Sequence, residues 1–456
     1  MSRWIRRHLL LPAFETLYQG RKTFRYARDL ARTQWLGRSE LEGIQLAALQ
    51  RLLGHAYDTC PYYRRSWDEL GLQSIHSLED FRAWPTIGRA ENGVHRAEMR
   101  STASGLRVLS KSTGGSTGEP LHFDLSTDSN DRRNAISLRG YEWAGATLGC
   151  KQFYLWGVAL GAQTARQRRK DRLYHWLYGR RYASTFGLGE ESCAQYVERF
   201  NDYRPDAIVA YTSSLYEFAR MIRQRGLSVH TPNAIVVGAE KLFPFQRELI
   251  EGVFQAPVFE TYGSREFMLI GGECDRHSGL HVSQEHLIVE VLDEDGHPAP
   301  DGAEGDVVIT DLYNYGMPFI RYRNGDRAVA GWGTCPCGRG LPLLREVSGR
   351  SADILRTPDG RCITGLIFPH LMKDFAGVKR FQVVQDEPDH VALRVVLRSG
   401  WGDGDRERID GIMRSTLGPT MRFDIVPVDD IPLTGSGKLR VVVNLCRDTA
   451  PATTPA

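Results

Sequence analysis

The length, composition and charge of this chain fit a soluble globular protein. Its 456 residues are 41% hydrophobic and 25% charged, and a chain of this length is expected to form two or three domains. The net charge of +3 is too near balance to indicate a nucleic-acid partner. No apolar run reaches the roughly 18 residues of a membrane helix, and residues 9–14, which Pro12 interrupts, are too short for a secretory signal.

The first 28 residues combine apolar side chains with many basic ones. A segment of this kind can lie on an anionic membrane surface. It can also be an ordinary solvated helix, which is the interpretation we favour. The basic residues are Arg3, Arg6, Arg7, Arg21, Lys22, Arg25 and Arg28.

The cysteines indicate a reducing compartment, and we expect a cytoplasmic protein. Eight cysteines are sparse for this length and do not resemble the disulfide scaffold of a secreted protein. Cys274 and His281 lie seven residues apart, and Cys335 and Cys337 flank one proline. Three thiolates and an imidazole suit tetrahedral zinc. We therefore predict a structural zinc site, with His277 as an alternative fourth ligand.

Residues 1–100 are predicted to form a helical region of a large N-terminal domain. Apolar residues recur at helical spacing between residues 41 and 53, and Pro61 is expected to end that helix.

Residues 109–123 form the stretch that most strongly suggests ligand binding. Their sequence is LSKSTGGSTGEPLHF. Hydroxyl side chains and glycines allow a tight backbone curve whose N–H groups can surround an anion, and a phosphate chain is the obvious ligand. The stretch is not a P-loop, because no Gly-Lys-Ser/Thr follows the glycines. Lys111 precedes them, so further positive charge is expected; a flexible Ser/Thr/Gly linker is the alternative.

Short apolar runs alternate with helical patterns in the next part of the chain. The predicted strands are residues 154–159, 207–211, 234–238 and 258–262. The predicted helices are residues 128–145, residues 193–200 and one that begins at Ser213 or Ser214. This alternation predicts a largely parallel α/β sheet, which binds ligands at the carboxyl ends of its strands. The segments at such ends are residues 211–214, 238–240 and 262–266.

The remainder of the chain predicts a change of architecture. Short β runs at residues 287–292 and 306–310 indicate an antiparallel β subdomain. Strands at 381–384 and 391–397 and a helix at 409–417 indicate a small α+β domain. The predicted division is a helical region (1–100), a nucleotide- and substrate-binding core (101–349), a mobile lid domain (350–446) and a tail (447–456) that is disordered from Thr449.

Three further side chains suit a nucleotide site. Glu266 follows a predicted strand, where a carboxylate can hold Mg²⁺ beside substrate phosphates. Asp326 follows an Asn-Gly turn and can accept hydrogen bonds from ribose hydroxyls. Lys438 ends the flexible sequence PLTGSGK and can reach a carboxylate or phosphate on another domain. Taken singly, each also fits an ordinary surface residue or turn.

Taken together, these motifs resemble the adenylate-forming superfamily of acyl-CoA synthetases, luciferases and peptide-synthetase adenylation domains. Their order is the Ser/Thr/Gly loop, Gly-Ala-Glu at 238–240, Tyr-Gly-x-x-Glu at 262–266, Gly-Asp at 325–326, Gly-Arg at 349–350 and the Lys438 motif. Within the superfamily, the chain is most similar to the phenylacetate–CoA ligase and CapK-type branch, through residues 52–63 and 113–120. The resemblance covers residues 40–440 and implies a large α/β domain with a mobile C-terminal α+β lid.

The resemblance implies ATP-dependent activation of a carboxylic acid as an acyl-adenylate, followed by transfer to a thiol such as CoA. The residues that would hold the β- and γ-phosphates are Ser112, Thr113, Gly114, Gly115, Ser116, Thr117 and Gly118. Those near the adenine would be Gly238, Ala239 and Glu240, with Tyr262 stacked nearby and Gly263 beside it. Asp326 and Arg350 would hold the ribose. Glu266 would bind Mg²⁺, and Lys438 would bridge the carboxylate and the α-phosphate.

Two positions depart from the pattern of this family. Many relatives have lysine directly after the proline of the phosphate loop, where this chain has Leu121. The hinge position after Gly-Arg is usually acidic or basic, and here it is Ala352, followed by Asp353. The adenylation step is therefore better supported than the thiol-transfer step.

The resemblance leaves the acceptor and the acid open. Aromatic or small acyl acids are the default substrates, and the acceptor is CoA or another thiol, an amine or a sugar. One alternative is AMP transfer to an acceptor, as in coenzyme F390 synthetase-like enzymes. Another is a non-catalytic nucleotide-binding protein of polysaccharide biosynthesis, although a decayed site would be expected to lose Lys438. The suggested substrate-pocket residues are Tyr154, Trp156, Tyr211 and Phe243; the oligomeric state stays open.

Overall fold

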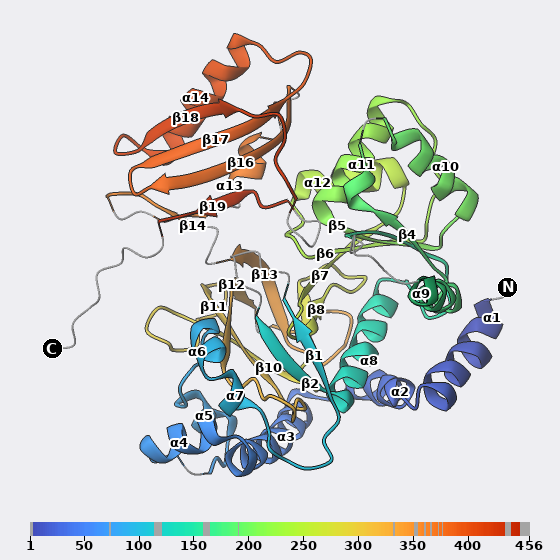
Figure 1. Cartoon of the computed structure of the whole chain (residues 1–456), viewed down its shortest axis with the longest axis vertical. Coiled ribbons are helices and arrows are strands. Elements are labelled where there is room, and N and C mark those ends of the chain that lie inside the picture. Colours follow the sequence, from blue (N-terminus) through green and yellow to red (C-terminus); the bar gives the residue numbers. More distant parts are fainter. Residues whose placement is uncertain are drawn as a thin grey trace. The chain divides into compact units, whose positions relative to one another are not determined.

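A mixed sheet of eleven strands forms the centre of the first of two structural units (Figure 1). The units, Met1–Val347 and Ser348–Ala456, are described separately. This computed structural model describes residues 3–72, 74–113, 121–157, 165–189, 191–331, 333–350, 354–359, 362–364, 367–372, 374–375, 377–433 and 439–446.

The large sheet has a parallel half and an antiparallel half. Its strands, in spatial order, are β10 (Leu287–Leu292), β11 (Glu304–Asp311), β12 (Tyr322–Gly331), β13 (Leu343–Arg350), β9 (Leu280–Val282), β8 (Met268–Gly272), β7 (Val258–Ser264), β6 (Ala234–Gly238), β5 (Ala207–Tyr211), β3 (Gln152–Trp156) and β4 (Arg180–Ser184). Strands β7, β6, β5, β3 and β4 pair in parallel, as predicted. The antiparallel strands predicted as a subdomain extend the same sheet, because β8 and β9, which the sequence analysis missed, connect the two halves.

The helices of this unit precede the strands in the sequence or connect them. They are α1 (Arg3–Ile5), η1 (Arg6–Leu10), η2 (Ala13–Tyr18), α2 (Thr23–Thr33), α3 (Arg38–Thr59), α4 (Pro61–Glu69), α5 (Leu78–Arg82), α6 (Arg89–Val94), α7 (Arg96–Met99), α8 (Thr127–Trp143), α9 (Ala165–Leu177), η3 (Thr185–Gly187), α10 (Cys193–Tyr203), α11 (Thr212–Gln224) and α12 (Pro244–Phe254). The expected break at Pro61 is confirmed, since α3 ends at Thr59 and Pro61 opens α4.

The parallel half of the sheet is covered on both faces, which is why its inner strands β5 and β6 are continuously apolar. Phe153 and Leu155 of β3 pack in the cluster formed with α10, α11 and α12. Tyr154 and Trp156 alternate to the opposite face, where they pack in a second cluster with residues at the end of α8. Figure 1 shows the two helical layers on opposite sides of these strands.

A separate hairpin carries the predicted phosphate loop. Strands β1 (Val108–Ser112) and β2 (His122–Ser126) pair antiparallel. Beyond the strands, the Thr113 N–H donates to the Leu121 carbonyl and the Leu121 N–H donates to Thr113 Oγ1, both at 2.9 Å. The loop residues between them, 114–120, lie outside the described residues.

The second unit has the predicted α+β organisation. Its sheet has the order β18 (Arg422–Pro427), β17 (His390–Leu397), β16 (Val378–Glu387) and β19 (Val442–Asn444). The central pair is antiparallel and the outer pairs are parallel. The other elements are β14 (Ile354–Arg356), β15 (Cys362–Thr364), α13 (Ile367–Met372) and α14 (Asp403–Leu417). Ala352, Asp353, Lys438 and the tail from Thr449 lie outside the described residues.

In the described part of the chain, no helix is both long and apolar enough to cross a bilayer.

A buried ion pair fixes α8 against the sheet. Arg133 of α8 and Asp311 at the end of β11 are both fully buried. The Arg133 guanidinium donates to the Asp311 carboxylate and to the main-chain carbonyl of Glu266. Burial alone would raise the pKa of Asp311, but His286 and Arg133 outweigh it and hold the pKa well below its usual range. The pair therefore joins a helix, a strand end and the turn after β7.

We expect Arg133→Met to lower the free energy of unfolding of the large unit by about 3–5 kcal/mol, because Asp311 is left as an uncompensated buried charge. Urea unfolding followed by circular dichroism measures this loss. Adding Asp311→Asn should recover part of it, because the unpaired charge is removed. Arg38→Met, which breaks the exposed Arg38–Glu42 pair, is the control and should change little. If Arg133→Met and Arg38→Met lowered the free energy of unfolding equally, that result would contradict this account.

Candidate active site

Two arginines bind the start of the loop that follows β1. Arg265 Nε donates to the Ser112 carbonyl at 3.1 Å. Arg89 Nη2 donates to Thr113 Oγ1 at 3.4 Å. Arg265 belongs to the turn between β7 and β8, so this contact brings the predicted Mg²⁺-binding segment and the predicted phosphate loop together.

Lys111 adds a third positive charge at the same place. Its Nζ donates to Asn130 Oδ1 at 2.9 Å. Burial is the main cause that lowers its pKa to about 8, and repulsion from Arg133 and Arg265 lowers it further. A cation that is desolvated beside other cations is stabilised by an incoming anion. Such additional charge was predicted from the sequence, but the two arginines are distant from the loop in sequence and could not be assigned to it.

The turn between β7 and β8 holds Glu266. A Cβ at position 263 would lie 2.1 Å from the Met268 carbonyl oxygen, so only glycine allows β7 and β8 to approach this closely. Strand β7 continues to Ser264, two residues beyond its predicted end. Glu266 is only 7% exposed, and Arg133 holds its carbonyl group. Arg133 is a positioning residue that sequence reasoning missed, because a basic residue in a helix carries no such signal.

Tyr262 and Asp326, which the sequence assigned separately to the nucleotide, lie in contact. The Tyr262 hydroxyl donates to Asp326 Oδ2 at 2.8 Å. Asn324 Nδ2 donates to both of these oxygens, also at 2.8 Å. The three polar side chains therefore form one group that joins the two halves of the sheet. Asn324 was not predicted as part of the site.

The prediction that Asn324, Gly325 and Asp326 form a turn is wrong. Residues 324–326 lie inside strand β12, where the register against β11 shifts between Asp306 and Val308. The extra residues make a bulge, and Gly325 adopts a φ of +81° there. The bulge aims Asp326 at Tyr262, and its carboxylate is partly buried instead of exposed.

The ends of β5 and β6 meet, as the parallel topology predicted. The Ser213 N–H donates to Glu240 Oε2 at 2.8 Å, and Thr212 Oγ1 donates to the Glu240 carbonyl at 3.1 Å. Ala239 has a φ of +71°, which is an uncommon conformation for a residue with a side chain. Such strain is concentrated at functional sites.

The remaining predicted residues are only partly described. Arg350 is the last residue of β13. Gly114, Gly115, Ser116, Thr117, Gly118 and Lys438 lie outside the described residues, so their roles stay predictions.

The suggested pocket residues do not form one group. Trp156 and Tyr211 are the last residues of the neighbouring strands β3 and β5, and their ring centroids lie 4.0 Å apart. Tyr154 instead stacks on Tyr182 at 4.6 Å, and Phe243 precedes α12 and stacks on Phe245 at 5.8 Å.

Four residues form a cluster suited to a metal. The ligand atoms of Cys274, His281, Cys335 and Cys337 all lie within 4.8 Å of one another. Cys274 Sγ and Cys335 Sγ are 3.7 Å apart, and Cys337 Sγ lies 3.4 Å from His281 Nε2. Ordinary zinc bond lengths in a tetrahedron require about 3.8 Å between two sulfurs and about 3.5 Å between sulfur and nitrogen. The separations therefore fit one tetrahedral ion.

The fourth ligand position belongs to His281 in this geometry. Burial lowers the pKa of His281 to about 4, so its imidazole is neutral and can coordinate a metal. His277, the alternative ligand, instead lies 3.2 Å from Glu273 Oε2 through Nδ1 and stacks on Phe259 at 4.8 Å. It is not part of the cluster.

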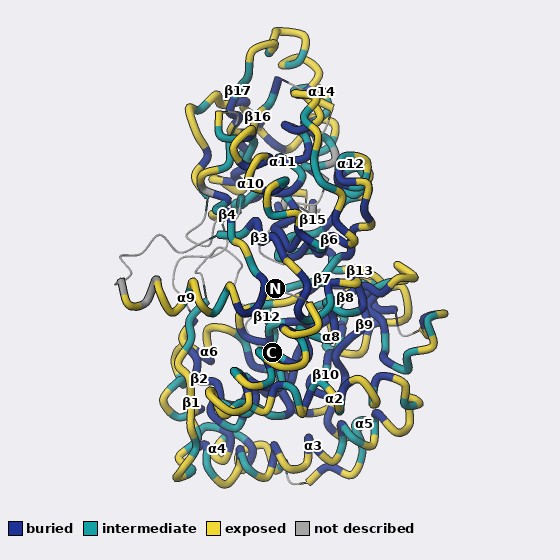
Figure 2. The backbone as a smooth tube through the Cα atoms, turned by 90° about the vertical axis from the view of Figure 1, so that its right-hand side faces the viewer, coloured by how far each residue is buried: buried dark blue, intermediate teal, exposed yellow. Residues whose placement is uncertain are grey.

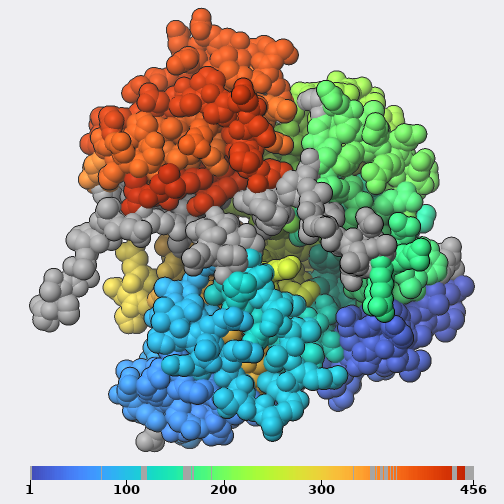
Figure 3. Space-filling view, viewed as in Figure 1, coloured from blue at the N-terminus to red at the C-terminus, as the bar shows by residue number. Residues whose placement is uncertain are grey.

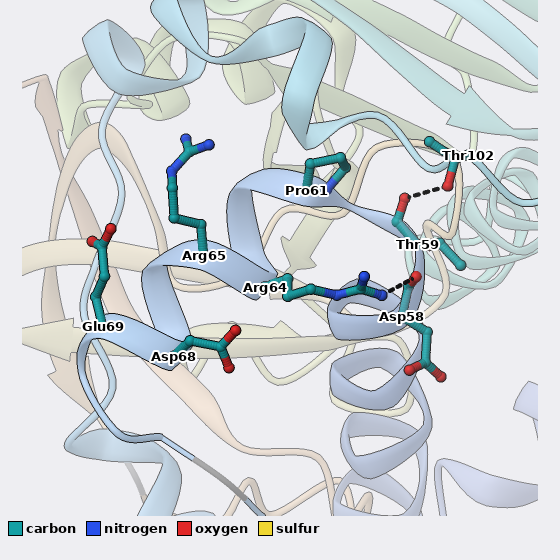
Figure 4. Close-up of a pocket in the computed structure, with 8 residues that line it drawn as sticks. All are labelled: Asp58, Thr59, Pro61, Arg64, Arg65, Asp68, Glu69 and Thr102. Carbon is teal, nitrogen blue, oxygen red and sulfur yellow. Dashed lines mark hydrogen bonds between the residues drawn. The ribbon is translucent and has the colours of Figure 1, made fainter.

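A polar cavity of about 440 Å³ lies elsewhere, at the junction of α3 and α4. Figure 4 shows Arg64 and Thr102 bound to neighbouring main-chain carbonyl groups at its edge. The lining residues are Asp58, Thr59, Pro61, Arg64, Arg65, Asp68, Glu69 and Thr102. None of them belongs to the segments described above, so this cavity is not part of the candidate site.

Comparison with solved structures identifies the fold. The crystal structure of 2-hydroxyisobutyryl-CoA ligase in its postadenylation state matches this chain with a TM-score of 0.72 and 21% identity, over 91% of each chain. The structure of the amide bond synthetase McbA from Marinactinospora thermotolerans matches with a TM-score of 0.51 and 17% identity, over 74% of this chain and 70% of that one. The predicted fold class, that of the adenylate-forming ligases, is confirmed.

Sequence relatives narrow this class to one branch. The chain is 25% identical over 448 residues to phenylacetate-coenzyme A ligase from Thermus thermophilus, covering 90% of this chain and 98% of that one. It is 23% identical over 358 residues to protein CapK from Staphylococcus aureus, covering 74% of each chain. The model of the CapK C-terminal domain family matches residues 355–445. Together these similarities support the adenylate-forming superfamily, and within it the phenylacetate–CoA ligase and CapK branch.

Proposed function

We propose that this protein is an ATP-dependent acid–CoA ligase that activates a carboxylic acid as its acyl-adenylate. The observation that carries the proposal is that Arg265 binds the base of the Ser/Thr/Gly loop to the same segment that holds Glu266 and the Tyr262–Asp326 pair. The relatives named phenylacetate-coenzyme A ligase support the same activity.

The reaction has two steps. A carboxylate oxygen of the acid attacks the α-phosphorus of ATP, and the bond to pyrophosphate breaks. The thiolate of CoA then attacks the acyl carbon, and AMP leaves. Both steps need positioned groups and neutralised phosphate charge more than they need covalent help from the protein.

The described residues divide this work. Arg265, Arg89 and Lys111 supply positive charge at the start of the phosphate loop. Asp326, oriented by Tyr262 and Asn324, accepts hydrogen bonds from ribose hydroxyls. By its motif, Glu266 would hold Mg²⁺, which would neutralise phosphate charge when bound. Lys438 is assigned by its motif to the carboxylate and the α-phosphate.

We further propose that Lys111 replaces the lysine that many relatives have after the loop proline. Leu121 occupies that position here, and it is buried. Lys111 lies on the opposite strand of the hairpin, in the residue before Ser112, whose carbonyl group binds Arg265. Lys111 would therefore supply its positive charge to the same loop from strand β1.

The cysteine–histidine cluster is proposed to hold a structural zinc ion. Its ligands come from the end of β8, from β9 and from the loop before β13. Four protein ligands leave no open position for a substrate, which is typical of a structural site. Trp143 of α8 contacts His281 edge-on at 5.4 Å, so the ion would fasten these strands beneath α8.

The activity predicts that pyrophosphate release from MgATP is stimulated by at least one acid from a panel of aromatic and small acyl acids. Glu266→Gln should lower kcat at least ~100-fold, because a charge-stabilising group is lost. The exposed Glu294→Gln, in the turn after β10, is the matched control and should behave like wild type. Failure of every acid would refute the activity. Pyrophosphate release without thioester formation on adding CoA would refute the CoA step and favour transfer to another acceptor.

The Lys111 assignment predicts a pH dependence. With a pKa of about 8, Lys111 loses its charge as pH rises above that value, so kcat/KM for MgATP should fall there. Lys111→Arg stays charged and should remove this decline. Lys111→Met should lower kcat/KM roughly 10-fold at neutral pH, as expected for the loss of one charge-assisted contact. The assignment is wrong if the methionine variant retains the wild-type pH profile.

The zinc assignment predicts about one zinc per chain in protein purified from metal-free buffer, measured by elemental analysis. Cys335→Ser should lose most of the metal and lower the melting temperature. Cys446→Ser removes a thiol outside the cluster and should retain the zinc. A zinc content near zero in the wild-type protein would contradict the assignment.

A further inference from the structure

Helix α9 presents large apolar side chains to solvent. Leu173 is 55% exposed and Trp176 is 53% exposed. The opposite side of the helix end is anchored, because Leu177 and Tyr178 pack with Leu11 in a buried cluster. Figure 2 shows α9 extending from the rest of the large unit with most of its turns exposed. The exposed face is therefore held in a fixed position and needs an explanation.

The same face is strongly basic. Arg166, Arg169, Leu173 and Trp176 follow one another at steps of three or four residues, which places them along one side of a helix. Lys170 and Arg172 are also exposed. Within the described part of the chain, Arg166, Arg169, Lys170 and Arg172 form no ion pair. Their charge is thus available to an external anion.

Two more exposed side chains adjoin this helix. Leu17 and Tyr18, in η2, are 84% and 78% exposed. Phe14 stacks on Tyr18 at 5.6 Å and contacts Tyr174 of α9 at 6.1 Å, so η2 lies against α9. Figure 3 shows the green atoms of this region beside the blue N-terminal segment. We call these residues the α9–η2 patch: Leu17, Tyr18, Arg166, Arg169, Lys170, Arg172, Leu173 and Trp176.

The basic residues of the N-terminal segment itself are used differently. Arg6 is buried and donates to the Gly149 carbonyl at 3.1 Å. Arg7 pairs with Glu142, and Arg21 pairs with Glu15. Several basic side chains of the N-terminal segment, which first suggested a membrane contact, are therefore engaged in contacts within the protein. The basic side chains of α9 named above form no ion pair in the described part of the chain.

We propose that the α9–η2 patch binds the surface of an anionic lipid bilayer. Tryptophan, tyrosine and leucine side chains partition into the interfacial region, and arginine and lysine are attracted to acidic headgroups. A second copy of this chain is a poorer occupant, because a symmetric contact would bring the same basic residues of both copies together. The binding is expected to be reversible and weakened by salt.

The test is co-sedimentation of the full chain with vesicles of phosphatidylcholine containing about 30% phosphatidylglycerol, compared with pure phosphatidylcholine. We expect binding to the anionic vesicles alone, and loss of that binding at about 0.5 M salt. The double variant Leu173→Ser/Trp176→Ser should bind roughly 10-fold more weakly, as should Arg169→Gln/Lys170→Gln/Arg172→Gln.

The control removes equally exposed apolar side chains elsewhere. Trp35 and Leu70 are 52% and 57% exposed, and Trp35→Ser/Leu70→Ser should bind like wild type. Circular dichroism and acid-dependent pyrophosphate release check that each variant is folded, and vesicle binding is read independently of that activity. Equal binding to neutral vesicles, no binding to either, or unchanged binding of both α9 variants would overturn the proposal. So would a change in oligomeric state, measured by light scattering, that accompanies loss of binding.

Discussion

The buried Arg133 guanidinium is the constraint on which the geometry of the candidate site depends. A charge without solvent must be paired, and Arg133 has Asp311 on one side and the Glu266 carbonyl on the other. The turn that carries Glu266 is thereby tied to a charge pair whose disruption is costly. Helix α8 also positions Asn130 against Lys111, one turn before Arg133. One helix therefore contacts both the turn that carries Glu266 and the strand that leads into the Ser/Thr/Gly loop.

The second constraint is the continuity of the sheet. Tyr262 comes from the parallel half and Asp326 from the antiparallel half, and their hydrogen bond spans the region that β8, β9 and β13 connect. A bulge interrupts the regular alternation of side chains in β12 between Arg323 and Arg327, and Asp326 lies within it. The group of Tyr262, Asn324 and Asp326 is thus built from a strand of the parallel half and a strand of the antiparallel half of one mixed sheet.

Strands and site segments that are encoded by a local sequence pattern could be predicted from the sequence. The apolar runs of β5 and β6 are buried on both faces, so hydrophobicity alone reveals them, and glycine-containing motifs identify the segments at the ends of β6 and β7. Strand β4 and helix α9 were missed because Arg180, Arg181 and the run of basic residues in α9 break the apolar period. Arg133, Asn324 and Arg265 were not assigned to the site because their roles follow from partners that lie far away in sequence. The cysteine–histidine cluster was predictable because metal-ligand chemistry restricts both the residue types and their short spacings.

The distribution of charge shows why the net value of +3 is a weak guide to binding. Arg89, Lys111 and Arg265 converge around one loop, and burial makes the charge of Lys111 costly there until an anion is present. The arginines of α9 are hydrated, so they are stable without a ligand and favour contact with an extended acidic surface. The nearly equal numbers of acidic and basic residues conceal both arrangements. The acidic residues that offset these basic ones pair elsewhere, as Asp311 does with Arg133. The proposed phosphate site therefore differs from the proposed lipid-facing patch in having one desolvated cation, Lys111, whose burial depends on the fold.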